Sequence, residues 1–307
     1  MTGIADVFTP EVNLEPEWTE PRATAPRRGR VLRRLLRNPA AMFGLVVVVL
    51  VVGMAVFAPL LAPYDPNDQD LLLRLQAPSA EHLLGTDDFG RDQLSRLIYG
   101  ARVSLVAAAQ LVAIGCGIGT VLGMIAGYRG GRFDSALGRV VDVMMALPGF
   151  LVAITVLAVL GPGLTNAMIA VGILVTPVFF RVARAATQDV REETYVEASR
   201  ALGCTTRRIV LRHVLPNAIA PVVVQIAILF GVAITVEASL SFIGLGVQPP
   251  TSTWGSMLST ANSFMSQAPH LMYVPGAMIA ITVLAFSLLG DGLAQALGTN
   301  RSAVVEK

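Results

Sequence analysis

The sequence predicts an all-α membrane protein that crosses the bilayer six times. Hydrophobic residues make up 54% of its 307 residues and charged residues only 14%, so much of the apolar surface has no polar counterpart to shield it from water. The apolar residues also gather in long runs without charge, of the length that about 30 Å of hydrocarbon requires. This pattern argues against a soluble multidomain protein.

The N-terminal residues are expected to form a cytoplasmic tail with a basic segment at the membrane surface. Residues 1–26 are rich in Pro, Glu and Thr and show no apolar period, which predicts a disordered tail. In residues 27–37, arginines and leucines can separate onto opposite faces of a short helix that lies on anionic lipid. Nucleic-acid binding is disfavoured for this basic run, because a membrane span follows at once.

Six apolar segments are long enough to cross the membrane. The first is longer than a signal-peptide core and should remain as an anchor. The third and fourth are separated by Gly161-Pro162-Gly163, which predicts a tight hairpin between two helices. The predicted spans cover residues 40–62, 103–127, 140–160, 164–180, 218–236 and 271–290.

The distribution of cations predicts how these spans are oriented. Of the 23 lysines and arginines, 19 fall on one side of the membrane when the spans alternate, and Arg74, Arg91, Arg96 and Arg102 fall on the other. Because cytoplasmic segments carry the excess of cations, both termini are predicted to be cytoplasmic in a bacterial inner membrane. The expected parts are a cytoplasmic tail (1–39), a first span (40–62), an extracytoplasmic segment (63–102), a five-helix domain (103–298) and a second cytoplasmic tail (299–307).

The second span carries glycines at every fourth position, so four positions without side chains line one helix face. Another helix can approach closely along such a face. Helix packing is the favoured interpretation, and a role in lining or gating a pathway is the alternative. The glycines are Gly115, Gly119, Gly123 and Gly127.

Three acidic residues near the spans are candidates for proton or sodium coupling. Glu237 lies about 28 Å beyond the start of the fifth span, which predicts a place at the outer interface, and Asp291 lies at the inner end of the sixth. Asp142 is the remaining candidate for a proton relay. Arg139, three residues earlier on the same helix face, favours a structural ion pair with Asp142 instead.

The sequence lacks the residues that ATP hydrolysis and metal chemistry need. A phosphate-binding loop requires Gly-x-x-x-x-Gly-Lys-Ser/Thr, and the single lysine is Lys307. His82, His213 and His270 fall in different loops, and the two cysteines lie far apart, so neither a metal centre nor a disulfide is predicted. The chain is therefore expected to be no enzyme and to hold no cofactor of its own.

The cytoplasmic loop of residues 185–216, between the fourth and fifth spans, is unusually regular for a connector. It reads as two short helices broken by Gly203, which can end the first in a left-handed conformation, while Thr205 can cap the second. Such a helix could lie at the membrane interface or insert into a groove on a soluble partner. One face of the first helix carries Tyr195, Ala198, Ser199 and Leu202.

This loop resembles the signature of binding-protein-dependent ABC transporter permeases. Glu197-Ala198-Ser199, then Gly203, then Leu215-Pro216 matches the family pattern of Glu-Ala-Ala, three residues, Gly, nine residues and Ile-x-Leu-Pro, with Ser199 for the second Ala and His213 for the Ile. In the family this loop is the coupling helix seated in the ATPase subunit. The resemblance implies ATPase-coupling roles for Tyr195, Val196, Glu197, Ala198, Ser199, Ala201, Leu202, Gly203, His213, Leu215 and Pro216.

Other stretches resemble the C-type subunit of dipeptide and oligopeptide permeases. The matching segments are residues 84–96, 100–105, 237–250, 254–255 and 290–293, and the resemblance covers about residues 30–298. It implies a type I ABC importer transmembrane bundle that translocates peptides. The implied partners are a second homologous permease subunit in a heterodimer, two ABC ATPase subunits that bind ATP and Mg²⁺, and an extracytoplasmic substrate-binding protein. The lipid bilayer is expected to surround the spans, and no nucleic-acid partner is expected.

The sequence is compatible with other substrates and with another class of transporter. Nickel and glutathione importers share the same motifs, so either ligand could replace peptides. A secondary transporter that works alone is the alternative from another class, and it would transport in vesicles that lack any ATPase partner. A membrane enzyme ranks third, because the sequence offers no nucleophile, base or metal set.

Overall fold

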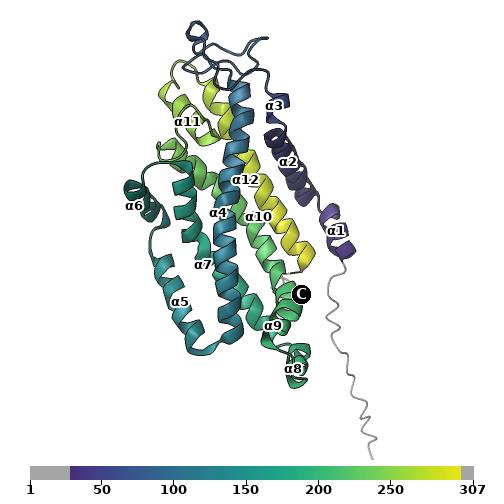
Figure 1. The fold of residues 1–307 in the computed structure, drawn as a ribbon. Helices are drawn as coiled ribbons and strands as arrows, with labels where there is room; N and C mark the ends of the chain where they lie inside the picture. Colours follow the sequence, from purple (N-terminus) through teal and green to yellow (C-terminus); the bar gives the residue numbers. More distant parts are fainter. Residues whose placement is uncertain (1–27, 299–307) are drawn as a thin grey trace, which may run out of the picture.

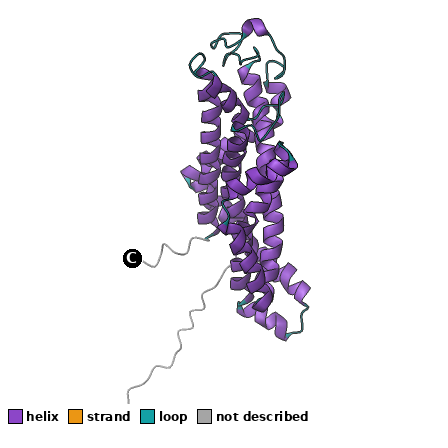
Figure 2. Ribbon diagram, turned by 90° about the vertical axis from the view of Figure 1, so that its left-hand side faces the viewer, coloured by secondary structure: helices purple, strands orange, loops and turns teal. Residues whose placement is uncertain are grey.

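The structure is a bundle of long helices that run side by side along one axis (Figure 1). The computed structural model describes residues 28–298, and this part of the chain contains no β-strand (Figure 2). The predicted tail of residues 1–26 and the predicted tail of residues 299–307 lie outside the described residues. Within 28–298, the helices long and apolar enough to cross a membrane are α2 (Pro39–Val56), α4 (Gln93–Arg129), α7 (Leu164–Arg191), α10 (Leu215–Phe242) with the turns before it, and α12 (His270–Leu297).

The third predicted span is bent, so the expectation of one helix over residues 140–160 is wrong. α5 (Gly131–Ala146) and α6 (Gly149–Leu160) meet at an angle of 85°. Pro148 disfavours helical backbone at the residue before it, and Leu147 is extended, with φ −84° and ψ 134°. Counted as one bent span, the pair brings the number of candidate spans to six.

Helical structure extends into the segments that connect the predicted spans. α4 begins at Gln93 rather than at residue 103, and Asp92 caps it by accepting the backbone N–H of Ser95 at 2.7 Å. A further helix, α11 (Trp254–Ser263), fills the connection between the last two spans. The shorter elements are α1 (Arg28–Arg37), α3 (Ala58–Leu61) and η1 (Leu71–Leu73).

α7 extends to Arg191, well past the predicted end at residue 180, and the added part makes ion pairs with α5. Arg181 lies 2.7 Å from Asp142, and Arg184 donates to Asp134 at 2.6 Å. The expected pair between Asp142 and Arg139 is therefore wrong, because the partner of Asp142 comes from the neighbouring helix. An ion pair between two helices leaves no trace in the hydropathy of one segment.

The four glycines of the predicted ridge lie along the contact between α4 and α7. A Cβ atom added at Gly119 would lie 2.5 Å from the carbonyl oxygen of Thr176 and 2.7 Å from the Cβ of Phe179. Cβ atoms at Gly115, Gly123 and Gly127 would likewise meet α7. Because no side chain fits, the two backbones approach closely along the whole ridge, and the geometry agrees with a packing role.

We expect Gly119→Leu to weaken the α4–α7 contact, because the added side chain must push the helices apart at a cost of about 1–3 kcal/mol. The melting temperature of the purified protein in detergent should fall. Gly117→Leu is the matched control, since a Cβ there meets nothing within 4 Å. Equal melting temperatures for the two variants would contradict the role of the ridge in packing.

Candidate functional site

Polar and irregular segments gather at the two opposite ends of the bundle (Figure 1). One end carries α8 (Thr194–Ala201) and α9 (Thr206–Ile209), which belong to the predicted cytoplasmic loop. The other end carries α11 and the loop that follows α3. Each end offers a surface through which a partner could act on the spans between them.

The first helix of the cytoplasmic loop ends as the sequence predicts. Leu202 is the C-cap of α8, and Gly203 follows with φ +76°. The N–H of Gly203 donates to the carbonyl of Arg200 at 2.9 Å, and the N–H of Cys204 donates to the carbonyl of Ser199 at 3.1 Å. These paired bonds form a Schellman motif, so the left-handed stop at Gly203 is confirmed.

The second helix of the loop is less regular than the sequence predicts. Thr205 stands at the N-cap of α9, but its side chain makes no capping hydrogen bond. A π-helical segment, Val210–Val214, then joins α9 to α10, and the N–H of Leu215 reaches the carbonyl of Val210 five residues back. Pro216 follows and cannot donate a backbone hydrogen bond, which favours irregular geometry at this point.

A single fully buried side chain of α8 fastens it to the bundle. Val196 packs in a cluster with Ile209, Val214 and Ala218, and residues of α4 and α7 lie against this cluster. The face that carries Tyr195, Ala198 and Leu202 points away from this cluster, since all three residues are exposed and Leu202 is 85% exposed. That face is therefore left open to a partner.

Tyr195 also belongs to the open side of α8 and holds it to the start of α10. The amide of Asn217 donates to the Tyr195 hydroxyl at 3.2 Å, and the tyrosine ring lies 6.1 Å from that of His213. Burial raises the pKa of the Tyr195 hydroxyl, and the charge of Glu193 adds to this effect. The hydroxyl therefore remains a neutral hydrogen-bonding group at neutral pH.

The remaining predicted coupling residues are divided between surface and contact. Ser199 and Leu215 are half-buried, whereas Glu197, Ala198, Ala201 and Pro216 are exposed. Glu197 lies in the first turn of α8, where a carboxylate suits the positive end of the helix dipole. A protruding helix with one carboxylate among small and apolar side chains can insert into a groove of another protein.

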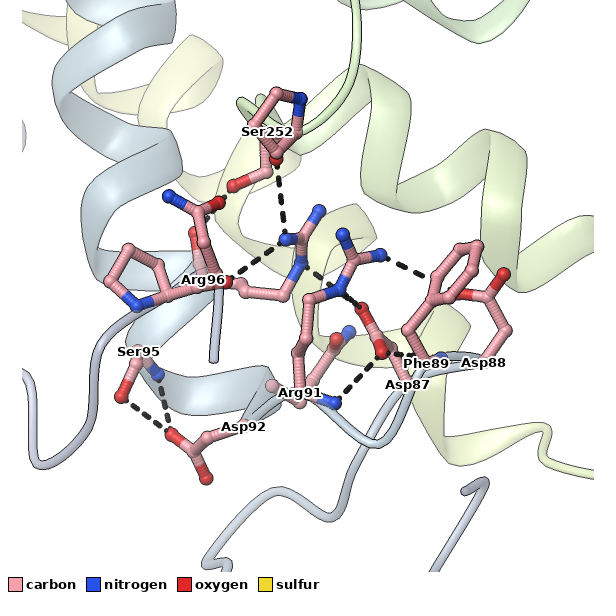
Figure 3. A network of polar contacts seen from close by, with 12 residues as sticks. Asp87, Asp88, Phe89, Arg91, Asp92, Ser95, Arg96 and Ser252 are labelled. Atoms are coloured by element: carbon pink, nitrogen blue, oxygen red, sulfur yellow. Dashed lines mark hydrogen bonds and ion pairs between the residues drawn. The ribbon is translucent and has the colours of Figure 1, made fainter. Parts of the chain in front are cut away.

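At the opposite end, one buried carboxylate binds two buried arginines (Figure 3). Asp87 lies 2.7 Å from Arg91 Nε and 3.2 Å from Arg96 Nε, and its other oxygen accepts two backbone N–H groups. Arg96 also donates to the carbonyl of Pro66 at 3.1 Å and to that of Pro250 at 3.5 Å. This network joins the loop after α3, the start of α4 and the segment before α11.

The sequence predicts an extracytoplasmic position for Arg91 and Arg96 but does not indicate this network. The spacing of Asp87 and Arg91, four residues apart, could have indicated one pair. Burial raises the pKa of the neighbouring Asp88, and the charge of Asp87 adds to this effect. Among residues 28–298, no group of three or more His, Cys, Asp and Glu side chains could hold a metal ion.

A second buried carboxylate links three helices beneath this network. Glu237 of α10 is fully buried and accepts hydrogen bonds from Ser104 of α4 at 3.0 Å and from Ser241 at 2.7 Å. The hydroxyl oxygen of Ser104 also accepts a hydrogen bond, at 3.3 Å, from the backbone N–H of Trp254, the first residue of α11. The predicted depth of Glu237 at the outer interface stays a prediction, and the structure adds that its carboxylate is enclosed by the protein.

Two family models match the chain. One is described as binding-protein-dependent transport system inner membrane component and matches residues 119–302. The other is described as N-terminal TM domain of oligopeptide transport permease C and matches residues 27–78. The matched ranges together cover α2, the last part of α4 from residue 119, and all of the later spans.

Relatives align over nearly the whole chain. The dipeptide transport system permease protein DppC of Alkalihalophilus pseudofirmus is 42% identical over 95% of each chain. The glutathione transport system permease protein GsiD of Pectobacterium atrosepticum is 43% identical over 86% of this chain and 88% of its own. The fold is similar to that of the MetNI methionine ABC transporter in an inward-facing conformation, with a TM-score of 0.55 at 19% identity over 66% of this chain and 97% of that one.

We expect Asp87→Asn to destabilise the outer end of the bundle, because it removes the carboxylate from buried Arg96 and leaves Arg91 with only Asp88 at 3.6 Å. Removing one partner of a buried ion pair typically costs about 3–5 kcal/mol. A lower melting temperature and faster proteolysis of the loop after α3 should follow. Glu81→Gln is the matched control, since Glu81 is exposed and its side chain makes no hydrogen bond within residues 28–298. If both variants melt like the wild type, the network is not a structural link.

Proposed function

We propose a coupling site, a contact with a second permease subunit and a peptide substrate for this chain. The chain belongs to the family of binding-protein-dependent transport system inner membrane components. It is a multi-pass permease subunit of a bacterial ATP-driven ABC importer. A permease of this family is no enzyme, because separate ATPase subunits hydrolyse ATP, and a substrate-binding protein belongs to the same system. In the proposal, ATP and Mg²⁺ are bound by those ATPase subunits and not by this chain.

We propose α8 as the coupling site. The proposal rests on one observation: α8 exposes most of its surface, while the buried side chain of Val196 attaches it to the bundle. Glu197 and Leu202 face outward, while Val196 is enclosed by Ile209 and Val214. A force applied to the outer face of α8 therefore reaches the start of α10 and the inner ends of α4 and α7 through packed side chains. Closure of the ATPase subunits would move α8 and open the pathway outward, and hydrolysis would reset it.

The second permease subunit is proposed to cover α5 and α6. These helices expose large apolar side chains such as Val143, Leu151 and Val159. Beside them lies the pair of Asp142 and Arg181, whose side chains remain 66% and 51% exposed. Charged side chains of membrane spans usually face protein or a water-filled cavity rather than lipid. A homologous subunit packed on this face would shield both the apolar surface and the ion pair.

Short peptides are the proposed substrates. The relatives are named for dipeptide and glutathione transport, and glutathione is itself a short peptide. We infer that the binding protein delivers the peptide to the outer end, where the network of Asp87, Arg91 and Arg96 gives the loop after α3 a fixed shape. Choice among peptides would then be made largely by the binding protein.

We expect Gly203→Val to abolish peptide uptake while the protein still inserts in the membrane. A Cβ at Gly203 meets nothing within 4 Å, so the effect comes from the left-handed backbone, which costs about 1–2 kcal/mol or more with a β-branched residue. Gly203→Asn is the control, because Asn tolerates this conformation and should retain uptake.

Glu197→Ala should also reduce uptake and release the ATPase subunits more readily. The measurements are dipeptide uptake in cells and co-purification of the ATPase subunits; normal values for Gly203→Val and Glu197→Ala would refute the coupling site.

We also expect both termini to be cytoplasmic. In a background without Cys116 and Cys204, a membrane-impermeant thiol reagent applied to intact cells should label Ala80→Cys, in the exposed outer loop, and spare Ser135→Cys, exposed at the other end of the bundle. Labelling of Ser135→Cys alone would reverse the orientation.

A further inference from the structure

An apolar groove of about 480 Å³ opens between α2, α4, α10 and α12. Its size lies in the range of about 300–1,000 Å³ that holds small-molecule ligands. At its floor the rings of Phe230 and Phe286 stack, with centroids 5.0 Å apart. Along its walls lie Val48, Val52 and Val56 of α2 and Leu105 and Val106 of α4.

The groove begins beyond the point at which α2 approaches α12 most tightly, near Gly44. A Cβ atom at Gly44 would lie 2.5 Å from the carbonyl oxygen of Ala285, so the two backbones touch there. One turn further along α2, at Val48, the lining of the groove begins. From Val48 to Val56 the wall is about 12 Å long, close to the roughly 15 Å of one hydrocarbon leaflet.

Arg102 is the single charged residue that lines this groove. It lies on the side of the outer loop, in the first turns of α4, and it is exposed. Its side chain makes no hydrogen bond or ion pair within residues 28–298. The other predicted extracytoplasmic arginines are engaged: Arg91 and Arg96 bind Asp87, and Arg74 lies over the Phe264 ring at 5.4 Å.

We propose that this groove binds one phospholipid of the outer leaflet, with its phosphate against Arg102 and one acyl chain along the valines of α2 down to Phe230. A phospholipid carries its charge at the interface and its apolar chain below it, which is the order in which the groove presents Arg102 and the valines. A transmembrane helix would bring apolar side chains to both places and leave Arg102 unpaired in a medium that penalises charge. This site does not depend on the coupling site or on the choice of substrate.

The bound chain would fill the space between α2 and α4 that protein atoms leave open. The lipid would then add to the protein contacts that α2 makes through Gly44, Val51 and Ala55. The site therefore predicts that a lipid remains with the purified importer after the bulk lipid has been removed.

The test uses the intact importer reconstituted in phosphatidylethanolamine vesicles that contain phosphatidylglycerol with a photoactivatable group on one acyl chain. After illumination, mass spectrometry of peptides should find the label on α2 near Val52 and on α4 near Val106. Arg102→Gln should lower this labelling about fivefold, as expected for loss of one interfacial cation. Arg74→Gln, the control for loss of an outer arginine, should leave it unchanged.

A second variant separates the groove from the cation. Val106→Trp fills the groove while keeping Arg102, and it should also lower labelling at Val52 without changing assembly of the importer. Equal labelling in the wild type, Arg102→Gln and Val106→Trp would overturn the site. So would efficient cross-linking of Val106→Cys to the second permease subunit in the intact importer, because a protein helix would then occupy the groove.

Discussion

The backbone contact between α4 and α7 is the constraint on which the other features depend. α4 is one helix of 37 residues, about 55 Å long, and its glycine ridge keeps α7 at a fixed separation. Its outer end carries Arg96 and Ser104, which hold the two buried carboxylates. Its inner end carries Met124 and Tyr128, which pack against the cluster beneath α8. A single rigid element therefore links the surface where substrate would arrive to the surface where ATPase subunits would act.

The outer loops and α8 are held to the spans by different kinds of contact. At the outer end, Asp87 and Glu237 make hydrogen bonds and ion pairs of fixed geometry, and these fasten loops and α11 to the spans. At the inner end, α8 is held by one buried valine and by one hydrogen bond between Asn217 and Tyr195, and a Schellman turn ends it. Directional polar bonds resist displacement, whereas a small apolar contact can move as a unit with its partner. The outer end is thus suited to present a constant surface, and the inner end to transmit motion.

The sequence predicts those features that depend on local backbone and on composition. Charge-free runs locate the spans, the four-residue spacing of Gly115 to Gly127 marks a helix contact, and Gly203 ends α8 as expected. Features that need a partner from elsewhere in the chain are missed. Asp142 binds Arg181 rather than Arg139, and Glu237 is enclosed by serines of two helices. The bend in the third span had a local signal in Pro148-Gly149, which the long apolar run around it concealed.

The bend between α5 and α6 has a consequence for hydration. Each helix end leaves backbone N–H or C=O groups without an intrahelical partner, and here two ends meet inside one candidate span. Hydrocarbon cannot satisfy these groups, so broken backbone at membrane depth persists only where protein or water reaches it. Leu147 and Phe150 on either side of the break are exposed in the isolated chain. The bend therefore marks a level at which protein or water, and not hydrocarbon, must surround the chain in the assembled transporter.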